Sequence, residues 1–467
     1  MNSITRFFSC EAMVKPSDRC GPLPTTKEGY FSMLSLAWPC MVEALLLCAV
    51  SFADTIMVGT LGPEAISAVG ITTQPKYIML SAILSLNIGV TAVVARRKGQ
   101  EDRDGANRCM KQCLILCLLL AAALTALGIA CARPLIAFAG ADFSILDDAT
   151  IYFQIVMLGH TFSSLTLTIN AAQRGCGNTR ISMTTNLAAN LVNILFNYLL
   201  INGIGPFPRL EVAGAAIATS LGSVVSFFLA LASILRRDSF VSVFTAVPWR
   251  FDKTTLSSVN RVALSAMAEQ VCLRIGFFAY AKIVASLGTL EFAVHQICMN
   301  IINITFAVGD GLGTAVTTLV GQSLGRSRPD MGKLYSSLSQ RVAFIICSFL
   351  SVFFYFGRYW LISLFNTDPR VLSLGGAVMV VIACIIHVQT AQIIMFGCLR
   401  GAGDTRFTAM VSLASVSLIR PTLTWFLAFP MGLGLIGAWV ALALDQIIRM
   451  ATTVWRVGSG KWAQIKL

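Results

Sequence analysis

Charged residues are scarce in this sequence of 467 residues. Asp, Glu, Lys and Arg make up 12% of the chain, whereas 56% of the residues are hydrophobic. A soluble domain carries about 25% charged residues, so the composition excludes an ordinary water-soluble protein. The chain is long enough for roughly a dozen spans of about 20 residues each. We therefore expect the lipid bilayer to surround most of it.

The sequence also has few of the residues on which enzymes and metal sites depend. It has three histidines and no CxxC pair, and we find no Ser-His-Asp set, metal-ligand spacing or phosphate loop. Cys109, Cys113 and Cys117 share one helical face and would suit a soft metal. Packing is the favoured interpretation, because thiols behave as small apolar groups inside membrane helices. We expect no enzyme activity, no cofactor and no structural disulfide.

The basic residues are unevenly distributed along the chain. They gather in both tails and in the loops after even-numbered spans, whereas the loops after odd-numbered spans hold Arg133, Arg209, Arg358 and Arg370. Loops rich in Lys and Arg stay in the cytoplasm. The net charge of +13 is thus read as a topology signal and not as a nucleic-acid footprint. We expect a multi-pass protein of the plasma (inner) membrane with both termini cytoplasmic.

The chain contains an internal repeat. Gln173-Arg-Gly-Cys-Gly-Asn-Thr-Arg180 returns 226 residues later as Leu399-Arg-Gly-Ala-Gly-Asp-Thr-Arg406. The glycines allow a tight turn, and the arginines keep it at a polar surface. The same offset places Glu43 on Glu269, both inside apolar segments. The sequence therefore predicts a duplicated, all-α membrane protein.

The repeat divides the chain into two lobes of six spans. We expect a cytoplasmic tail over 1–29, a first lobe over 30–236, a cytoplasmic linker over 237–255, a second lobe over 256–455 and a cytoplasmic tail over 456–467. Residues 1–29 have no apolar core ending in a cleavage site, which favours a retained tail. The spans are expected near 30–58, 65–95, 109–131, 145–172, 181–201, 212–235, 256–287, 290–321, 334–357, 370–398, 407–429 and 433–455.

A few ionisable residues lie inside these spans, where a charge needs a partner or a cavity. Glu43 and Glu269 sit at equivalent depth in the two halves and would suit a cation or proton site, or else serve helix packing. Asp54 lies three helical turns beyond Glu43 on roughly the same face, and its repeat counterpart is Tyr280. A structural ion pair is also expected between Asp445 and Arg449, which lie four residues apart on one helix face.

Several motifs resemble the multidrug and toxic compound extrusion (MATE) family over about residues 30 to 455. They are Ala53-Asp-Thr-Ile-Met-Val-Gly59 with Leu61-Gly62, the two arginine-glycine turns, and Val320-Gly-Gln322 with Leu324-Gly325. The resemblance implies the MATE fold: twelve transmembrane helices in two pseudo-symmetric lobes around a central cavity. It also implies export of amphipathic, mostly cationic compounds in exchange for inward H⁺ or Na⁺ by rocker-switch alternating access.

The resemblance also assigns roles to particular residues. Asp54 matches the first-lobe acid proposed as a protonation site, and Pro39 matches the proline at which that helix bends. Glu269 matches the seventh-span acid of the sodium site proposed for NorM-type members. We take Asp54, Glu269 and Glu43 as candidate coupling residues and Pro39 as a hinge. The candidate cavity contacts are Asn193, Asn197, Gln389, Gln392 and Tyr280.

Two positions depart from the family pattern. Gln389 stands where NorM-type members have a tenth-span aspartate, so the sodium site lacks one charge. Asn197 stands where archaeal members have a fifth-span aspartate beside an asparagine, here Asn193, and this substitution resembles the NorM-type branch. A sodium ion needs several oxygen ligands and benefits from net negative charge, whereas a proton needs one suitable carboxylate. The sequence therefore favours H⁺ over Na⁺ as the coupling ion.

The resulting interpretation is a cation-coupled multidrug efflux transporter. We expect its partners to be organic cations, the coupling cation and the bilayer, and we expect a monomer. One alternative is a lipid or polysaccharide-precursor flippase of the same superfamily. That alternative would be expected to show a more basic cavity or more than twelve spans. A second alternative is a membrane enzyme or receptor without transport, which the duplication and the mirrored acids disfavour.

Overall fold

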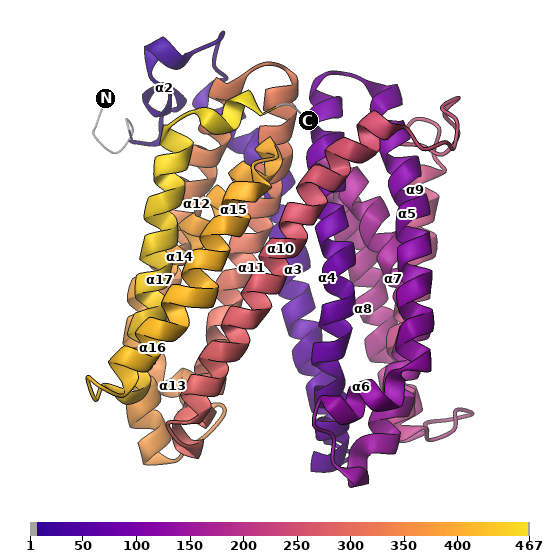
Figure 1. Cartoon of the computed structure of the whole chain (residues 1–467), viewed down its shortest axis with the longest axis vertical. Coiled ribbons are helices and arrows are strands. Elements are labelled where there is room, and N and C mark those ends of the chain that lie inside the picture. Colours follow the sequence, from indigo (N-terminus) through magenta and orange to yellow (C-terminus); the bar gives the residue numbers. More distant parts are fainter. Residues whose placement is uncertain (1–6, 466–467) are drawn as a thin grey trace. The chain divides into compact units, whose positions relative to one another are not determined.

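The computed structural model describes residues 7–465. This part of the chain is built from helices and contains no β-strand. Twelve helical segments among the described residues are long and apolar enough to cross a membrane, and Figure 1 shows the long helices of the chain as coiled ribbons. The predicted number of spans and the helical fold class are confirmed. The first six residues of the expected N-terminal tail and the last two of the C-terminal tail lie outside the described residues.

The helices reach beyond the apolar segments that predicted them. The third span, expected from Cys109, begins at Arg103, and the ninth, expected from residue 334, begins at Pro329. In both cases polar residues before the apolar run continue the same helix. Asp102 caps the first of these two, because its carboxylate accepts a hydrogen bond from the amide of Gly105 at 2.8 Å and so satisfies a free N–H of the first turn.

The chain forms two compact units. One, called here the N-unit, runs from Val42 to Met267, and the other, the C-unit, joins the chain up to Met41 to the stretch Ala268–Leu467. Two long helices therefore contribute to both units: α3 (Thr26–Gly59) and α10 (Lys253–Ala285). They pass from one unit to the other after Met41 and after Met267, positions that are 226 residues apart. The chain thus changes from one unit to the other at equivalent positions of the internal repeat.

Within the N-unit, the central helix is α7. It packs against α4, α5 and α9, and α9 packs against α8, an arrangement that Figure 1 shows from the side. The helices that lie entirely in this unit are α4 (Pro63–Gly99), α5 (Arg103–Ala130), α6 (Ala132–Phe138), α7 (Phe143–Gly175), α8 (Thr179–Asn202) and α9 (Glu211–Ile234).

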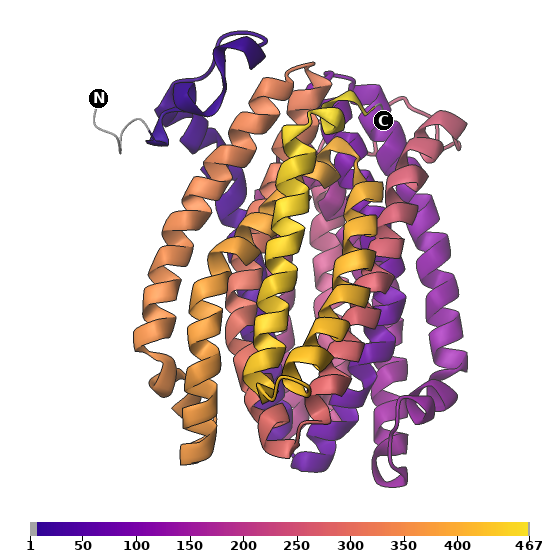
Figure 2. The ribbon, with the colours of Figure 1, turned by 60° about the vertical axis from the view of Figure 1, so that its left-hand side comes forward.

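The C-unit repeats this packing around α14. That helix packs against α11, α12 and α17, and α17 packs against α16, as Figure 2 shows for the orange and yellow helices. A π-helical segment, Leu413–Ile419, separates α15 from α16. The helices of this unit are α2 (Cys10–Met13), α11 (Thr289–Gly325), α12 (Pro329–Phe356), α13 (Arg358–Ser363), α14 (Pro369–Ala402), α15 (Thr405–Ser412), α16 (Arg420–Ala428) and α17 (Gly434–Gly458).

The two arginine-glycine turns connect equivalent helices, α7 to α8 and α14 to α15. Gly177 and Gly403 have φ values of +91° and +84°, which side chains with a Cβ rarely adopt. Gly175 and Gly401 serve a different purpose, the close approach of two helices. A Cβ on Gly401 would lie 2.3 Å from the carbonyl oxygen of Thr317, and one on Gly175 would lie 3.0 Å from a backbone oxygen of α4.

The stretch between α9 and α10 is held against the N-unit by side chains of α5. Lys111 donates to the carbonyls of Thr245 and Val247 at 3.0 and 2.8 Å, and Gln112 donates to the carbonyl of Arg250 at 2.8 Å. Asp252 then begins α10 by accepting hydrogen bonds from two threonines, and these bonds hold its pKa below the usual range. The expected inter-lobe linker is therefore an ordered part of the N-unit.

Candidate transport site

Asp54 lies at one end of a chain of hydrogen bonds that crosses three helices of the N-unit. The amide of Asn197, on α8, donates to its carboxylate at 2.6 Å and lies 3.3 Å from the side-chain oxygen of Asn193. Asn193 in turn donates to the hydroxyl of Thr219, on α9, at 3.1 Å. The structure thus joins Asp54 to Asn193 and Asn197, two residues selected from the sequence as cavity contacts. Asn193 and Asn197 are buried, and the Asp54 side chain is half-buried.

Two further residues of the N-unit lie within electrostatic reach of Asp54. Lys76, on α4, attracts the carboxylate, although the pair is not one of the ion pairs found among the described residues. The charge of Asp54 also acts on the phenol of Tyr152, which is buried on α7. None of Lys76, Tyr152 and Thr219 was selected from the sequence. Their residue types are common in membrane helices, and only the fold brings them to Asp54.

Glu43 is buried in a polar cluster of the N-unit. One carboxylate oxygen accepts from Ser182 at 2.8 Å and from Asn186 at 2.7 Å, and it lies 3.4 Å from the guanidinium of Arg174. Arg174 also donates to Ser182 at 2.8 Å. Arg174 belongs to the first arginine-glycine turn, so this glutamate ties α3 to the turn and to α8.

Glu269 occupies the equivalent cluster of the C-unit. It is fully buried and accepts from Arg400, of the second arginine-glycine turn, and from Thr408 at 2.7 Å. Glutamate, arginine and hydroxyl residue each lie 226 positions after their N-unit counterparts. The repeated motif therefore has a structural explanation: in each unit it supplies the cation that neutralises a buried glutamate.

The remaining candidate cavity residues lie in the interior of the C-unit. Gln389 and Gln392 are buried, and Gln389 donates to the hydroxyl of Thr305 at 3.3 Å. Tyr280 is 1% exposed, and its hydroxyl donates to the carbonyl of Ala438 at 3.2 Å. The ring of Tyr280 lies in the hydrophobic core. A cavity contact for these three residues stays a prediction.

Pro39 lies inside an uninterrupted α3. It is buried and stands two residues before Met41, after which the chain passes from the C-unit to the N-unit. A proline in a helix interior removes one backbone hydrogen bond. Bending at this point would change the direction of the segment that carries Glu43 and Asp54.

A third charged cluster lies in the core of the C-unit. Asp445 and Arg449 are 3.2 Å apart, which confirms the pair predicted from their spacing. Arg420 also donates to Asp445, at 3.0 Å. The hydroxyl of Ser415, in the π-helical segment, donates to the other oxygen of the same carboxylate. Asp445 is fully buried and paired on both sides, so it is committed to holding α17 against the π-helical segment and α16.

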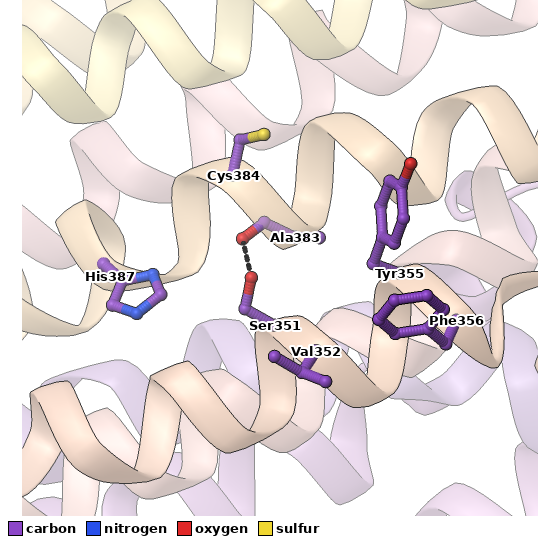
Figure 3. A pocket seen from close by; sticks show the side chains of 7 residues that line it. All are labelled: Ser351, Val352, Tyr355, Phe356, Ala383, Cys384 and His387. Atoms are coloured by element: carbon purple, nitrogen blue, oxygen red, sulfur yellow. Dashed lines mark hydrogen bonds between the residues drawn. The ribbon is translucent and has the colours of Figure 1, made fainter.

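A hollow of about 440 Å³ lies on the surface of the C-unit between α12 and α14. Figure 3 shows Ser351, Tyr355 and Phe356 on α12 beside Ala383 and His387 on α14, with the hydroxyl of Ser351 donating to the carbonyl of Ala383. Its lining has no carboxylate. The surrounding exposed side chains of α12, among them Phe349 and Phe356, are large and apolar, as expected of a face that contacts lipid. The hollow therefore does not have the character of a site for a charged solute.

Comparison with known proteins identifies the family. The sequence model of the MatE family matches the chain twice, over residues 39–199 and again over 266–426. The chain belongs to the MatE family. The two matches coincide with the two halves of the internal repeat. MatE proteins are transporters and not enzymes, so the chain is a multi-pass member of the multidrug efflux transporters of this family and requires no cofactor.

Curated relatives match the MatE chain over most of its length. A probable multidrug resistance protein NorM of Thermotoga maritima is 26% identical over 434 residues, which cover 92% of both chains. An FAD transporter of Shewanella oneidensis is 28% identical over 357 residues, covering 75% of this chain and 78% of its own. The first relative supports the NorM-type assignment made from Asn197 and Glu269.

A solved structure shares the fold. It is an outward-facing multidrug resistance MATE transporter, which superposes with a TM-score of 0.87 at 20% sequence identity. The superposition covers 94% of this chain and 97% of the other. This likeness establishes the MATE fold predicted from the motifs.

Proposed function

We propose that this MatE transporter exports amphipathic organic cations in exchange for an inward-moving cation. The observation that carries the proposal is the polar chain from Asp54 through Asn197 and Asn193 to Thr219. It joins one ionisable carboxylate to neutral amides and a hydroxyl inside a membrane-spanning unit. Such a carboxylate can be neutralised by a proton or attract a cation, and the two states compete.

Among the described residues, Asp54 belongs to no ion pair, unlike three other acids of the spans. Glu43 is paired with Arg174, Glu269 with Arg400, and the third cluster is built around a doubly paired aspartate. Each of these charges is already neutralised by an arginine that cannot lose its proton. We therefore assign coupling to Asp54 and give Glu43 and Glu269 a positioning role, holding the arginine-glycine turns in each unit.

We propose H⁺ as the coupling ion. The interior of the C-unit around Gln389 supplies an amide and the hydroxyl of Thr305, and the nearby glutamate, Glu269, is already bound to Arg400. Dehydrating Na⁺ there would require oxygen ligands with more negative charge. A proton needs only Asp54.

Transport would proceed by alternating access, with bending of α3 near Pro39 changing the surroundings of Asp54. The equivalent changes of unit in α3 and α10 support two half-structures that move as bodies. We further propose that the protein is a monomer of the plasma (inner) membrane, with both termini in the cytoplasm. The uneven distribution of basic residues among the loops supports this orientation.

Uptake into inside-out membrane vesicles tests the proposed function. Vesicles containing the protein should accumulate ethidium, a fluorescent organic cation, when an ion gradient is imposed, and should release it when the gradient is dissipated. Vesicles from cells that lack the protein provide the control. Equal ethidium accumulation in both preparations under every gradient would remove the proposal of organic-cation export.

A further inference from the structure

Helix α11 has an exposed face without a single large apolar side chain. The helix has 37 residues, Thr289–Gly325. Five of them are exposed: Thr289, Ala293, Gln296, Asn303 and Asp310. Gln296, Asn303 and Asp310 are spaced by seven residues, which places them on one face of a helix with 3.6 residues per turn. The rest of the helix is buried or half-buried. The exposed stripe of α11 is therefore polar along its length.

Neighbouring α12 has the opposite character. Its exposed side chains include Phe344, Phe349, Val352 and Phe356, of which Phe349 is 72% exposed. Both helices cross the membrane in the same unit, so their exposed faces meet different surroundings. Large apolar side chains are stable against lipid, whereas amides and a carboxylate are costly there. The α11 stripe is thus expected to contact water.

Asp310 lies near the middle of this wet stripe. It follows the start of α11 by 21 residues and precedes its end by 15, about 31 and 22 Å at 1.5 Å per residue. Among the described residues, none donates a hydrogen bond to its carboxylate, and none of the ion pairs includes it. Arg400 interacts with Asp310 electrostatically but is bound to Glu269.

We propose that Asp310 binds the positive charge of the transported organic cation. The inference rests on the proposed export function and adds a residue of the second half to it. Asp310 combines the three properties required: a carboxylate, exposure to water at membrane depth, and no ion pair with a protein cation. Asn303 and Gln296 extend the site along the same face and supply amide oxygens. The repeat counterpart of Asp310 is Leu84, so the site belongs to the C-unit alone.

The ion pair next to Asp310 is already complete without it. Arg400 and Glu269 neutralise each other, so their cluster leaves Asp310 as the uncompensated charge of this region. A substrate cation that reaches Asp310 restores neutrality without displacing an arginine. An anionic substrate would meet repulsion at the same place.

Thiol labelling tests whether the stripe is wet. In an active background without native cysteines, single cysteines at positions 296, 303 and 310 should react with a charged methanethiosulfonate. A cysteine replacing Phe349 is the matched control: that position is also exposed in the structure, but on the apolar face expected to contact lipid, where a thiol does not ionise. An unreactive cysteine at 310, or equal reactivity at 349, contradicts the wet face.

Ethidium binding to the purified protein tests the role of the carboxylate. Asp310→Asn should raise the Kd for ethidium about tenfold, with the thermal unfolding midpoint unchanged. Asp310→Glu should restore most of the affinity. Asn303→Asp in the Asp310→Asn protein, which moves the carboxylate two turns along the same face, should restore part of it, whereas a structural defect would not be repaired from there.

The outcomes separate this inference from the proposed function. If the unaltered protein neither binds nor transports ethidium, the export proposal fails. If it transports ethidium and Asp310→Asn has the same Kd and KM, then export stands and the Asp310 site is wrong. If Asp310→Asn keeps its Kd but loses its response to the ion gradient, Asp310 serves the coupling ion, which also overturns the inference.

Discussion

At the scale of single residues, the acids of the membrane spans differ in what neutralises them. Glu43, Glu269 and Asp445 each have an arginine partner. Asp54 is bonded to an amide, and Asp310 has no hydrogen-bond or ion-pair partner among the described residues. A paired buried acid stabilises a packing arrangement, whereas an unpaired one is free to exchange a proton or a ligand. The division between structural and functional acids therefore follows from their neighbours.

Replacing Asp54 by asparagine should abolish concentrative export while preserving the fold. The amide keeps the size of the side chain and its contact with Asn197 but cannot take up or release a proton. Ethidium accumulation against a gradient should fall at least tenfold, and gradient-independent exchange should persist. Asp148→Asn, at an exposed position of α7, is the control and should behave as the unaltered protein. An Asp54→Asn protein that concentrates ethidium at the normal rate would show that this acid has no part in coupling.

Removing Arg400 should destabilise the protein because it leaves Glu269 charged and buried. Loss of one partner of a buried ion pair costs about 3–5 kcal/mol, so Arg400→Gln should lower the unfolding midpoint clearly. Arg174→Gln should have a smaller effect, since the Glu43 side chain is 11% exposed against 1% for Glu269 and keeps two other donors.

A double-mutant cycle supplies the control for this pair. Adding Glu269→Gln to Arg400→Gln removes the stranded charge, so the double variant should be more stable than Arg400→Gln alone. Strictly additive losses in the two single variants and the double variant would mean that the ion pair contributes no coupling energy.

At the scale of helices, the turns and close contacts explain why the motif is glycine-rich. Gly401 lets α14 approach α11 where a Cβ would lie 2.3 Å from the carbonyl oxygen of Thr317. The motif was found from its repetition, and its arginines were assigned to a polar turn. Their pairing with Glu43 and Glu269 could not be predicted, because residues 131 positions apart in the sequence meet only once the helices have packed.

Gly401→Ala should push α14 away from α11. Overpacking of this kind costs about 1–3 kcal/mol, and the unfolding midpoint in detergent should fall accordingly. Gly458→Ala, at the end of α17 where a Cβ meets nothing within 4 Å, provides the comparison and should be neutral. Equal midpoints for the two variants would show that the backbone contact at Thr317 is easily relaxed.

The positions of the helices could be predicted to within a few residues. Irregular segments within them and the contacts between their side chains were harder to predict. Apolar runs revealed all twelve spans, because no soluble pattern has that length. The π-helical segment at Leu413–Ile419 has no comparable signal in its sequence. Asp54 was selected from the motif that carries it, but Lys76 and Tyr152 were not, since their relation to Asp54 depends on how α4 and α7 pack. Asp310 had no assigned role until its exposure separated it from the paired acids.

At the scale of the whole molecule, the duplication explains both the fold and its asymmetry. The two units repeat the same helix packing and the same glutamate-arginine cluster. They differ at the positions that carry the proposed function: Asp54 corresponds to the buried Tyr280, and Asp310 to Leu84. Duplication thus supplied the scaffold, and under the proposed assignments divergence of a few residues gave one unit the proton-binding role and the other the substrate-binding role.

The proposed orientation is testable by labelling intact cells. A cysteine replacing Asp142, in the exposed loop before α7, should react with an impermeant thiol reagent. A cysteine replacing Asp238, in the exposed part of the segment between α9 and α10, should react only after the cells are permeabilised. A background without native thiols is required, because Cys20 and Cys384 are exposed. The reverse pattern would invert the orientation and with it the direction of transport.

The most direct test of the account is ethidium transport by the purified protein in liposomes under one gradient at a time. A pH gradient without sodium should drive transport, and Asp54→Asn should abolish it. A sodium gradient with the pH clamped on both sides should drive none. Transport under the pure sodium gradient, or pH-driven transport that survives Asp54→Asn, would contradict the assignment of proton coupling to this carboxylate.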